Sequence, residues 1–186
     1  MREIDAIGAP GPRPAIVRLR IAMAAAGAAA SALSLPTQAC TAAFGEPDRL
    51  WLGPDEWLLL SMSRTAAELI ELCTARLDGL RHHAVDASAA LERIALQGDH
   101  VRPLLSMGCG LDFDIGQFAV GGCMRTRFAR IPIVILARAT QRFELLYDRS
   151  YRAYLTQWLT RAASDPLIAD AGGVGTPARP RRSEGS

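Results

Sequence analysis

The sequence contains no lysine, because all 21 basic residues in its 186 positions are arginines. This absence excludes chemistry that depends on a lysine amine, such as Schiff-base formation or the phosphate-binding lysine of a P-loop. The formal net charge is only +2, and residues 171–186 account for it with three arginines and one glutamate. A nucleic-acid groove needs a basic stripe. We therefore expect a near-neutral folded body and no nucleic-acid partner.

Cysteine and histidine are also scarce, and their spacing is not that of a metal site. The four cysteines form no C-x-x-C pair, which favours small buried side chains in a cytoplasmic protein. His82 and His83 are adjacent, and neighbouring residues on a strand point to opposite faces. The sequence thus predicts no metal site in this chain.

Motifs for nucleotide binding and hydrolysis are missing too, including G-x-G-x-x-G, G-x-x-x-x-G-K, H-E-x-x-H and G-x-S-x-G. The segment Gly108-Cys109-Gly110 is too short to indicate a phosphate site, and we interpret it as a turn that needs glycine. Cys109 as a thiol nucleophile is the less favoured alternative, since no nearby residue supports it. We expect no catalytic and no cofactor-binding residue in this chain.

A long run of small apolar residues, 21–33, is dominated by alanine and glycine. It is too weakly hydrophobic to cross a bilayer, so it predicts an Ala-rich helix that ends before Pro36, and no membrane segment. Residues 1–14 are rich in Pro and Gly and predict a flexible leader. Residues 170–186 predict a disordered tail. One domain, residues 15–169, remains between them.

Within this domain, strand and helix patterns alternate. Thr65 to Glu68 matches a capping box, which predicts a helix from Thr65 to about Leu80. Ser150 is a plausible N-cap for the last helix, and a short helix is expected near 99–107. Strands are expected at 16–20, 49–53, 56–61, 82–88, 91–97, 123–130, 131–138 and 142–147. This order predicts an α+β fold with antiparallel sheets and packed helices.

The densest apolar stretch is "RLWLGPDEWLLLS", residues 49–61. Pro54 and Asp55 suit the centre of a type I turn, so the two halves should form a hairpin. With Leu52 opposite Trp57, and Trp51 opposite Leu58, both faces are apolar. One face would carry Leu50, Leu52, Trp57 and Leu59, and the other Trp51, Leu58 and Leu60. A strand with one face in water alternates apolar and polar residues. These strands do not alternate, so both faces should be covered. Helices can cover one face, and the other needs more of this chain or another subunit.

Four segments, in order over about residues 30–160, resemble one protein family. "LWLGPDEWLLLS" resembles the signature of the gamma subunits of bacterial heterotetrameric sarcosine oxidases. The other three are "ALSLPTQA", "AVDASAALERIALQGDHVRPLLSMGCGLDF" and "FELLYDRSYRAYLTQWL". The sequence departs from the family pattern at Met107 and Gly110, where lysine and proline are expected beside Gly108-Cys109.

The resemblance implies a fold like part of the aminomethyltransferase (T-protein) folate-binding fold, and a non-catalytic assembly role. The implied complex oxidatively demethylates sarcosine to glycine and is linked to one-carbon folate metabolism. Its partners would be the alpha, beta and delta subunits, chiefly alpha, with FAD, FMN, NAD, zinc and tetrahydrofolate held by those partners. The resemblance marks a signature and candidate interface, Trp51, Gly53, Pro54, Asp55, Glu56 and Trp57, and a looser turn motif, Gly108 and Cys109.

A stand-alone folate-binding or aminomethyltransferase-like domain is the alternative function. It would need a carboxylate to hold the pteridine in an aromatic pocket. Asp86, in "AVDAS", is the candidate for that carboxylate, although a turn or cap role near Ser88 is favoured.

Overall fold

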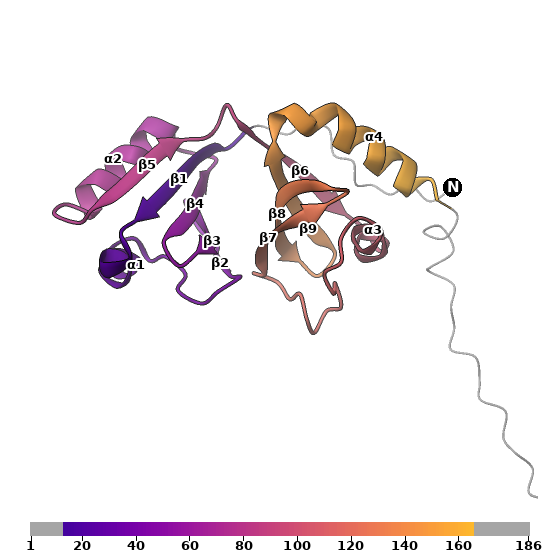
Figure 1. Ribbon diagram of the computed structural model, residues 1–186, viewed down its shortest axis with the longest axis horizontal. Helices are drawn as coiled ribbons and strands as arrows, with labels where there is room; N and C mark the ends of the chain where they lie inside the picture. The colour runs from indigo at the N-terminus through magenta and orange to yellow at the C-terminus, as the bar shows by residue number, and fades with distance from the viewer. Residues whose placement is uncertain (1–12, 166–186) are drawn as a thin grey trace, which may run out of the picture.

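The computed structural model describes residues 13–165, which form two antiparallel sheets with helices on their outer sides (Figure 1). The first sheet has the order β2-β3-β4-β1-β5 and the second the order β6-β9-β8-β7. All strand pairs in this part of the chain are antiparallel. The expected α+β class with antiparallel sheets and packed helices is confirmed.

The first half of the chain builds the first sheet and the two helices that cover it. Its elements are β1 (Ala15–Ile21), the 3-10 turn η1 (Met23–Ala25), α1 (Ala26–Leu33), β2 (Ala42–Ala43), β3 (Asp48–Gly53), β4 (Glu56–Ser61), α2 (Ala66–Arg76) and β5 (His82–Asp86). The second half builds the second sheet. Its elements are β6 (Leu91–Gln97), α3 (Val101–Gly108), β7 (Cys123–Phe128), β8 (Ile131–Ala139), β9 (Arg142–Asp148), η2 (Arg149–Tyr151) and α4 (Arg152–Ala163).

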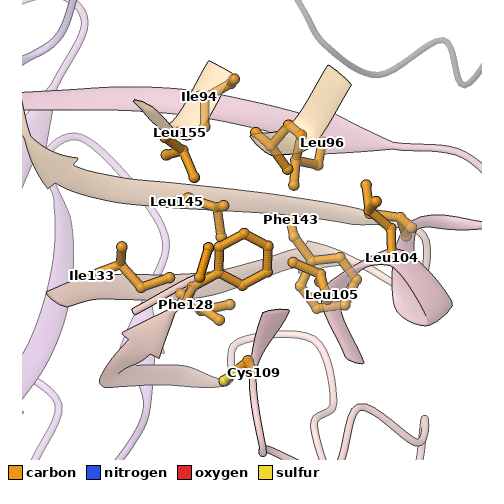
Figure 2. Packing of buried hydrophobic residues seen from close by; sticks show 14 of the residues in the cluster. Ile94, Leu96, Leu104, Leu105, Cys109, Phe128, Ile133, Phe143, Leu145 and Leu155 are labelled. Atoms are coloured by element: carbon orange, nitrogen blue, oxygen red, sulfur yellow. The ribbon is translucent and has the colours of Figure 1, made fainter. Parts of the chain in front are cut away.

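Three apolar layers hold these elements together. One lies between the first sheet and helices α1 and α2, and includes Trp57 and Leu59. A second lies between the two sheets and includes Leu58 of β4 and Leu136 of β8. The third lies between the second sheet and helices α3 and α4 (Figure 2). The molecule is therefore a four-layer stack of helices, sheet, sheet and helices.

The β3–β4 hairpin forms where the sequence predicts it, but the predicted register is wrong. Gly53 pairs with Glu56 across the expected turn, and a bulge between Trp51 and Gly53 then shifts the pairing. As a result, Trp51 opposes Trp57 rather than Leu58. The predicted faces are wrong as well, because Leu50, Leu52, Leu58 and Leu60 share the layer between the sheets. Trp51, Trp57 and Leu59 pack toward the helices.

Both faces of the hairpin are covered, as the lack of alternation predicts, and this chain supplies the cover on both sides. The second sheet covers the face of the hairpin for which another subunit was the alternative cover. A 186-residue chain has enough apolar surface for this arrangement because each of its two sheets contributes one side of the shared layer.

Helix starts differ from the sequence-based expectations. The capping box at Thr65 and Glu68 is confirmed. The Ala-rich helix starts later than predicted, because β1 continues to Ile21, which pairs with His82. Ser150 is not the N-cap of α4: it lies in η2, where the Asp148 side chain accepts its N–H, and α4 begins at Arg152.

None of the helices within residues 13–165 has both the length and the hydrophobicity to cross a membrane. The predicted leader, apart from Arg13 and Pro14, and the predicted tail lie outside the described residues. The domain limits 15–169 therefore remain a prediction.

Candidate functional site: the signature hairpin

The two tryptophans of the signature are on the helix-facing side of the hairpin. Trp57 is 2% exposed, and its indole Nε1–H donates a hydrogen bond to the Pro36 carbonyl oxygen at 2.9 Å. This bond ties β4 to the segment that follows α1, so the Leu-Pro segment and the signature meet in space. Trp51 is partly buried beside it. Both tryptophans thus serve the packing of α1 and α2 on the sheet.

The turn of the hairpin, residues 53–56, is bonded to β1 through both its backbone and a side chain. The Ile21 N–H donates to the Asp55 carbonyl oxygen at 3.0 Å, and the Asp55 carboxylate pairs with Arg20 Nη2 at 2.8 Å. Pro54 at the tip is exposed. Gly53 is the strand residue that pairs with Glu56. The turn is therefore held in place by its neighbour strand, and its tip is open to solvent.

Glu56 links the two sheets. It is 8% exposed, and its Oε1 lies 2.8 Å from Arg125 Nη2 on β7 and 3.5 Å from Arg18 Nε on β1. A carboxylate this buried needs charged partners, because desolvation without them is costly. Glu56 meets that need with one arginine from each sheet. The signature thus places a charge where the two halves of the molecule come together.

The arginines around Glu56 were not singled out from the sequence. Arg18 and Arg20 alternate on β1, and Arg125 and Arg127 alternate on β7. The signal that could have found them is the repeated R-x-R spacing, in "VRLRI" and "MRTRF", since residues two apart on a strand share a face. All four point to the side on which the two sheets face each other.

The turn motif Gly108-Cys109 lies elsewhere: its Cys109 is in the layer between the second sheet and its helices (Figure 2). Cys109 is 7% exposed, and its Sγ lies 3.6 Å from the Thr126 hydroxyl oxygen. The Gly108 carbonyl oxygen accepts the Ala129 N–H at 2.8 Å. The structure does not bring this motif together with the signature hairpin. Its described contacts anchor the end of α3 against β7.

Gly108 leaves no room for a side chain, and this permits a direct test. A Cβ on Gly108 would lie 2.6 Å from Cε2 of Phe128, which is fully buried. We expect Gly108→Ala to lower the free energy of unfolding by about 1–3 kcal/mol, because overpacking displaces the ring. Gly110→Ala is the matched control, since nothing lies within 4 Å of its Cβ position. Equal urea-denaturation midpoints for the two variants would contradict this packing.

Two further cysteines are buried thiols. Burial raises the pKa of Cys73 to about 11. Burial, with a smaller contribution from Cys40, raises the pKa of Cys123 to about 12. Both stay protonated at neutral pH, and the thiolate is the reactive form. Within residues 13–165, no three or more His, Cys, Asp or Glu residues are grouped so that they could hold a metal ion.

Asp86, the candidate for a pteridine contact, closes a turn after β5. Its Oδ1 accepts the Ser88 N–H at 2.8 Å, and hydrogen bonds from Ser88 lower the pKa of the carboxyl. Ser88 in turn receives the Ile16 N–H on its hydroxyl at 2.9 Å. The contacts of Asp86 are thus those of the cap residue that the sequence favoured.

Comparison with known proteins gives one consistent result. The model of the family described as "Sarcosine oxidase, gamma subunit family" matches residues 19–165. A sarcosine oxidase subunit gamma from Corynebacterium sp. (strain U-96) is 30% identical over 121 residues, which are 65% of this chain and 58% of that protein. The subunit gamma from Corynebacterium sp. (strain P-1) is 29% identical over 116 residues, which are 62% of this chain and 56% of that protein. The matched part thus spans less than two thirds of these curated relatives.

Solved structures share the fold. A chain of the heterotetrameric sarcosine oxidase from Corynebacterium sp. U-96, in complex with pyrrole 2-carboxylate, matches with a TM-score of 0.74 and 21% identity. That match covers 92% of this chain and 91% of the other. The glycine cleavage system aminomethyltransferase T from Bartonella henselae matches with a TM-score of 0.58 and 16% identity, over 87% of this chain and 49% of that one. The predicted likeness to part of the aminomethyltransferase fold is confirmed.

Proposed function

Because the chain belongs to the sarcosine oxidase gamma subunit family, we propose that it is the non-catalytic assembly subunit of a heterotetrameric sarcosine oxidase. The observation that carries this proposal is the family match over residues 19–165. That span runs from within β1 to two residues beyond the last helix and includes the whole signature hairpin. The proposal concerns the complete complex, of which this chain would be one of four subunits.

In this proposal the complex oxidatively demethylates sarcosine to glycine and feeds one-carbon folate metabolism in the cytoplasm. The partners are the alpha, beta and delta subunits, with alpha as the main contact. FAD, FMN, NAD, zinc and tetrahydrofolate are assigned to those partners. The residues Trp51, Gly53, Pro54, Asp55, Glu56 and Trp57 are assigned to the subunit's framework and, at the exposed tip, to its interface.

The contacts of the signature residues support a structural role. Trp57 holds the segment after α1, Asp55 holds β1, and Glu56 joins β1 to β7. Each polar group named here is occupied by a partner within the chain. Groups that stabilise the fold in this way hold the subunit surface in one conformation. This favours assembly, because less conformational entropy is lost on binding.

We expect the chain expressed alone to be colourless and unable to oxidise sarcosine. Co-expressed with the alpha, beta and delta subunits, it should co-purify in fixed ratio. The measurements are the visible absorbance and sarcosine-dependent peroxide formation of the isolated chain, beside size-exclusion chromatography of the co-expressed set. A yellow and active isolated chain, or a chain that elutes apart from the other three, would refute the proposal.

The alternative, a stand-alone folate-binding domain, is disfavoured by the contacts of Asp86. Its carboxylate already accepts the Ser88 N–H, so a pteridine would have to compete for it. Tight binding of tetrahydrofolate by the isolated chain, abolished by Asp86→Ala but not by the control Asp78→Ala on another exposed surface, would reinstate this alternative.

A further inference from the structure

Beyond their shared apolar layer, the facing sides of the two sheets carry exposed arginines on β1 and β7. On β1, Val17, Leu19 and Ile21 pack toward the helices, so Arg18 and Arg20 lie on the side of the second sheet. On β7, Phe128 packs toward α3 and α4, so Arg125 and Arg127 lie on the side of the first sheet. We call these four residues, Arg18, Arg20, Arg125 and Arg127, the arginine surface.

This surface is open to solvent. The side chains of Arg18, Arg20 and Arg125 are 47%, 58% and 48% exposed, and Arg127 is exposed too. Val85 on β5, which pairs with Arg18, is 43% exposed although it lies on the same side of the first sheet. The layer between the sheets therefore ends before it reaches β5. In Figure 1, β5 and β7 belong to different halves of the molecule.

The arginine surface has more positive charge than its own carboxylates neutralise. Two acids face it: Asp55 pairs with Arg20, and Glu56 pairs with both Arg18 and Arg125. Four guanidinium groups thus share two carboxylates, an excess of two positive charges. Arg127 has no carboxylate partner among the residues that the structure describes. On a body with a formal charge close to zero, this is a local concentration of one sign.

The position of β7 adds a second requirement for the occupant. β7 is the last strand in the order β6-β9-β8-β7. The start of its outer edge is occupied, because the Cys123 N–H donates to the Cys40 carbonyl oxygen at 2.8 Å. The edge beside Arg125 and Arg127 makes no backbone hydrogen bond to another segment of the described residues. An exposed edge can accept another extended segment through main-chain hydrogen bonds. Arginines along the edge repel a second copy of the same strand and attract a segment with acidic side chains. Guanidinium groups bind carboxylates through paired hydrogen bonds, which adds orientation to the attraction.

Resting on the function proposed above, we propose that the arginine surface is the docking site for an acidic, extended segment of a partner subunit of the oxidase. The segment's carboxylates would pair with Arg127 and with Arg18 and Arg125, which share the single carboxylate of Glu56. The exposed hairpin tip at Pro54 precedes Asp55 and Glu56, which pair with these arginines, and would form one border of the contact. This assigns a partner chemistry to the signature region that the framework role alone does not give.

The test is charge reversal within the complete complex. All four subunits are co-expressed, and the dissociation of the purified complex on dilution is measured by mass photometry at low and high salt. Arg127→Glu should raise the dissociation constant of the complex about tenfold or more at low salt. It should also reduce the salt dependence of this constant, because charge pairs at a contact contribute to affinity and are screened by salt. Since Arg127 has no described ion pair, the melting temperature of the isolated variant should equal that of the unmodified chain.

Arg142→Glu is the matched control, because Arg142 is also an exposed arginine, at the start of β9, but lies off the arginine surface. It should leave dissociation unchanged. If the unmodified chain forms no complex, the proposed function fails. If it forms one that Arg127→Glu and Arg142→Glu weaken equally, or not at all, only the docking assignment is overturned. Tight binding of a single-stranded oligonucleotide probe that Arg127→Glu abolishes would overturn it in favour of a nucleic-acid surface.

Discussion

Replacing Trp57 by alanine is expected to lower the free energy of unfolding by about 3–5 kcal/mol, the range for a large buried aromatic side chain. Trp57 is among the largest fully enclosed side chains of the described part of the chain. Its ring fills the layer between β4 and helices α1 and α2, where Val17 and Leu69 are also completely buried. Truncation would leave a cavity that these rigid neighbours cannot fill.

The variant Trp57→Phe separates the ring from its hydrogen bond. Phenylalanine keeps most of the buried volume but cannot donate to the Pro36 carbonyl oxygen. Losing this bond should lower the free energy of unfolding by about 1–2 kcal/mol. The larger loss expected for alanine, which comes from the cavity, should not occur in the phenylalanine variant. Urea denaturation followed by circular dichroism measures both. An alanine variant whose midpoint barely moves would show that Trp57 is not in the core.

The hairpin illustrates what the sequence could and could not predict. Its strands follow from apolar residues on both sides of Gly53-Pro54-Asp55-Glu56, and its double cover follows from the lack of alternation. The register could not be predicted, because a bulge near Leu52 moves every pair by one position without a marker in the sequence. The source of the cover depends on the second sheet, whose strands are far away along the chain.

Charge pairs were the least predictable part, because their members are far apart in sequence. Glu56 meets Arg125 across 69 residues, and Glu144 meets Arg93 across 51. The alternation of side chains along a strand predicts only which charged residues share a face with apolar neighbours. Whether a polar residue on a strand faces water or a buried partner depends on the packing of the two sheets. The R-x-R spacing was readable, but its meaning required β1 and β7 to be placed opposite each other.

The most buried of these charges is Glu144 on β9, which is 2% exposed. Its Oε1 accepts a hydrogen bond from Arg93 Nη1 at 3.1 Å, and its Oε2 lies 2.9 Å from Arg138 Nη2. The same nitrogen of Arg138 lies 2.6 Å from Asp48 Oδ2 on β3. The Arg138 Nε–H has no acceptor among residues 13–165. Glu144 and Arg138 therefore connect the second sheet to the first inside a region with little access to water.

We expect Glu144→Gln to lower the free energy of unfolding by about 3–5 kcal/mol, the cost of removing one partner from a buried ion pair. The substitution keeps the shape but leaves Arg93 and Arg138 facing a neutral amide. Asp55→Asn is the matched control: it neutralises the carboxylate of the Arg20–Asp55 pair, whose side chains are 58% and 32% exposed. An exposed pair contributes about 0–1 kcal/mol, so this variant should hardly move the urea midpoint.

The double variant Glu144→Gln with Arg138→Gln tests whether the lost charge is the cause. If the uncompensated guanidinium of Arg138 produces the destabilisation, removing it should recover part of the loss, with a coupling of about 0.5–3 kcal/mol between the two positions. Recovery should stay incomplete, because Arg93 and Asp48 then each lack their ion-pair partner. Strictly additive losses would mean that Glu144 and Arg138 act independently, and that the uncompensated guanidinium of Arg138 is not the cause of the destabilisation.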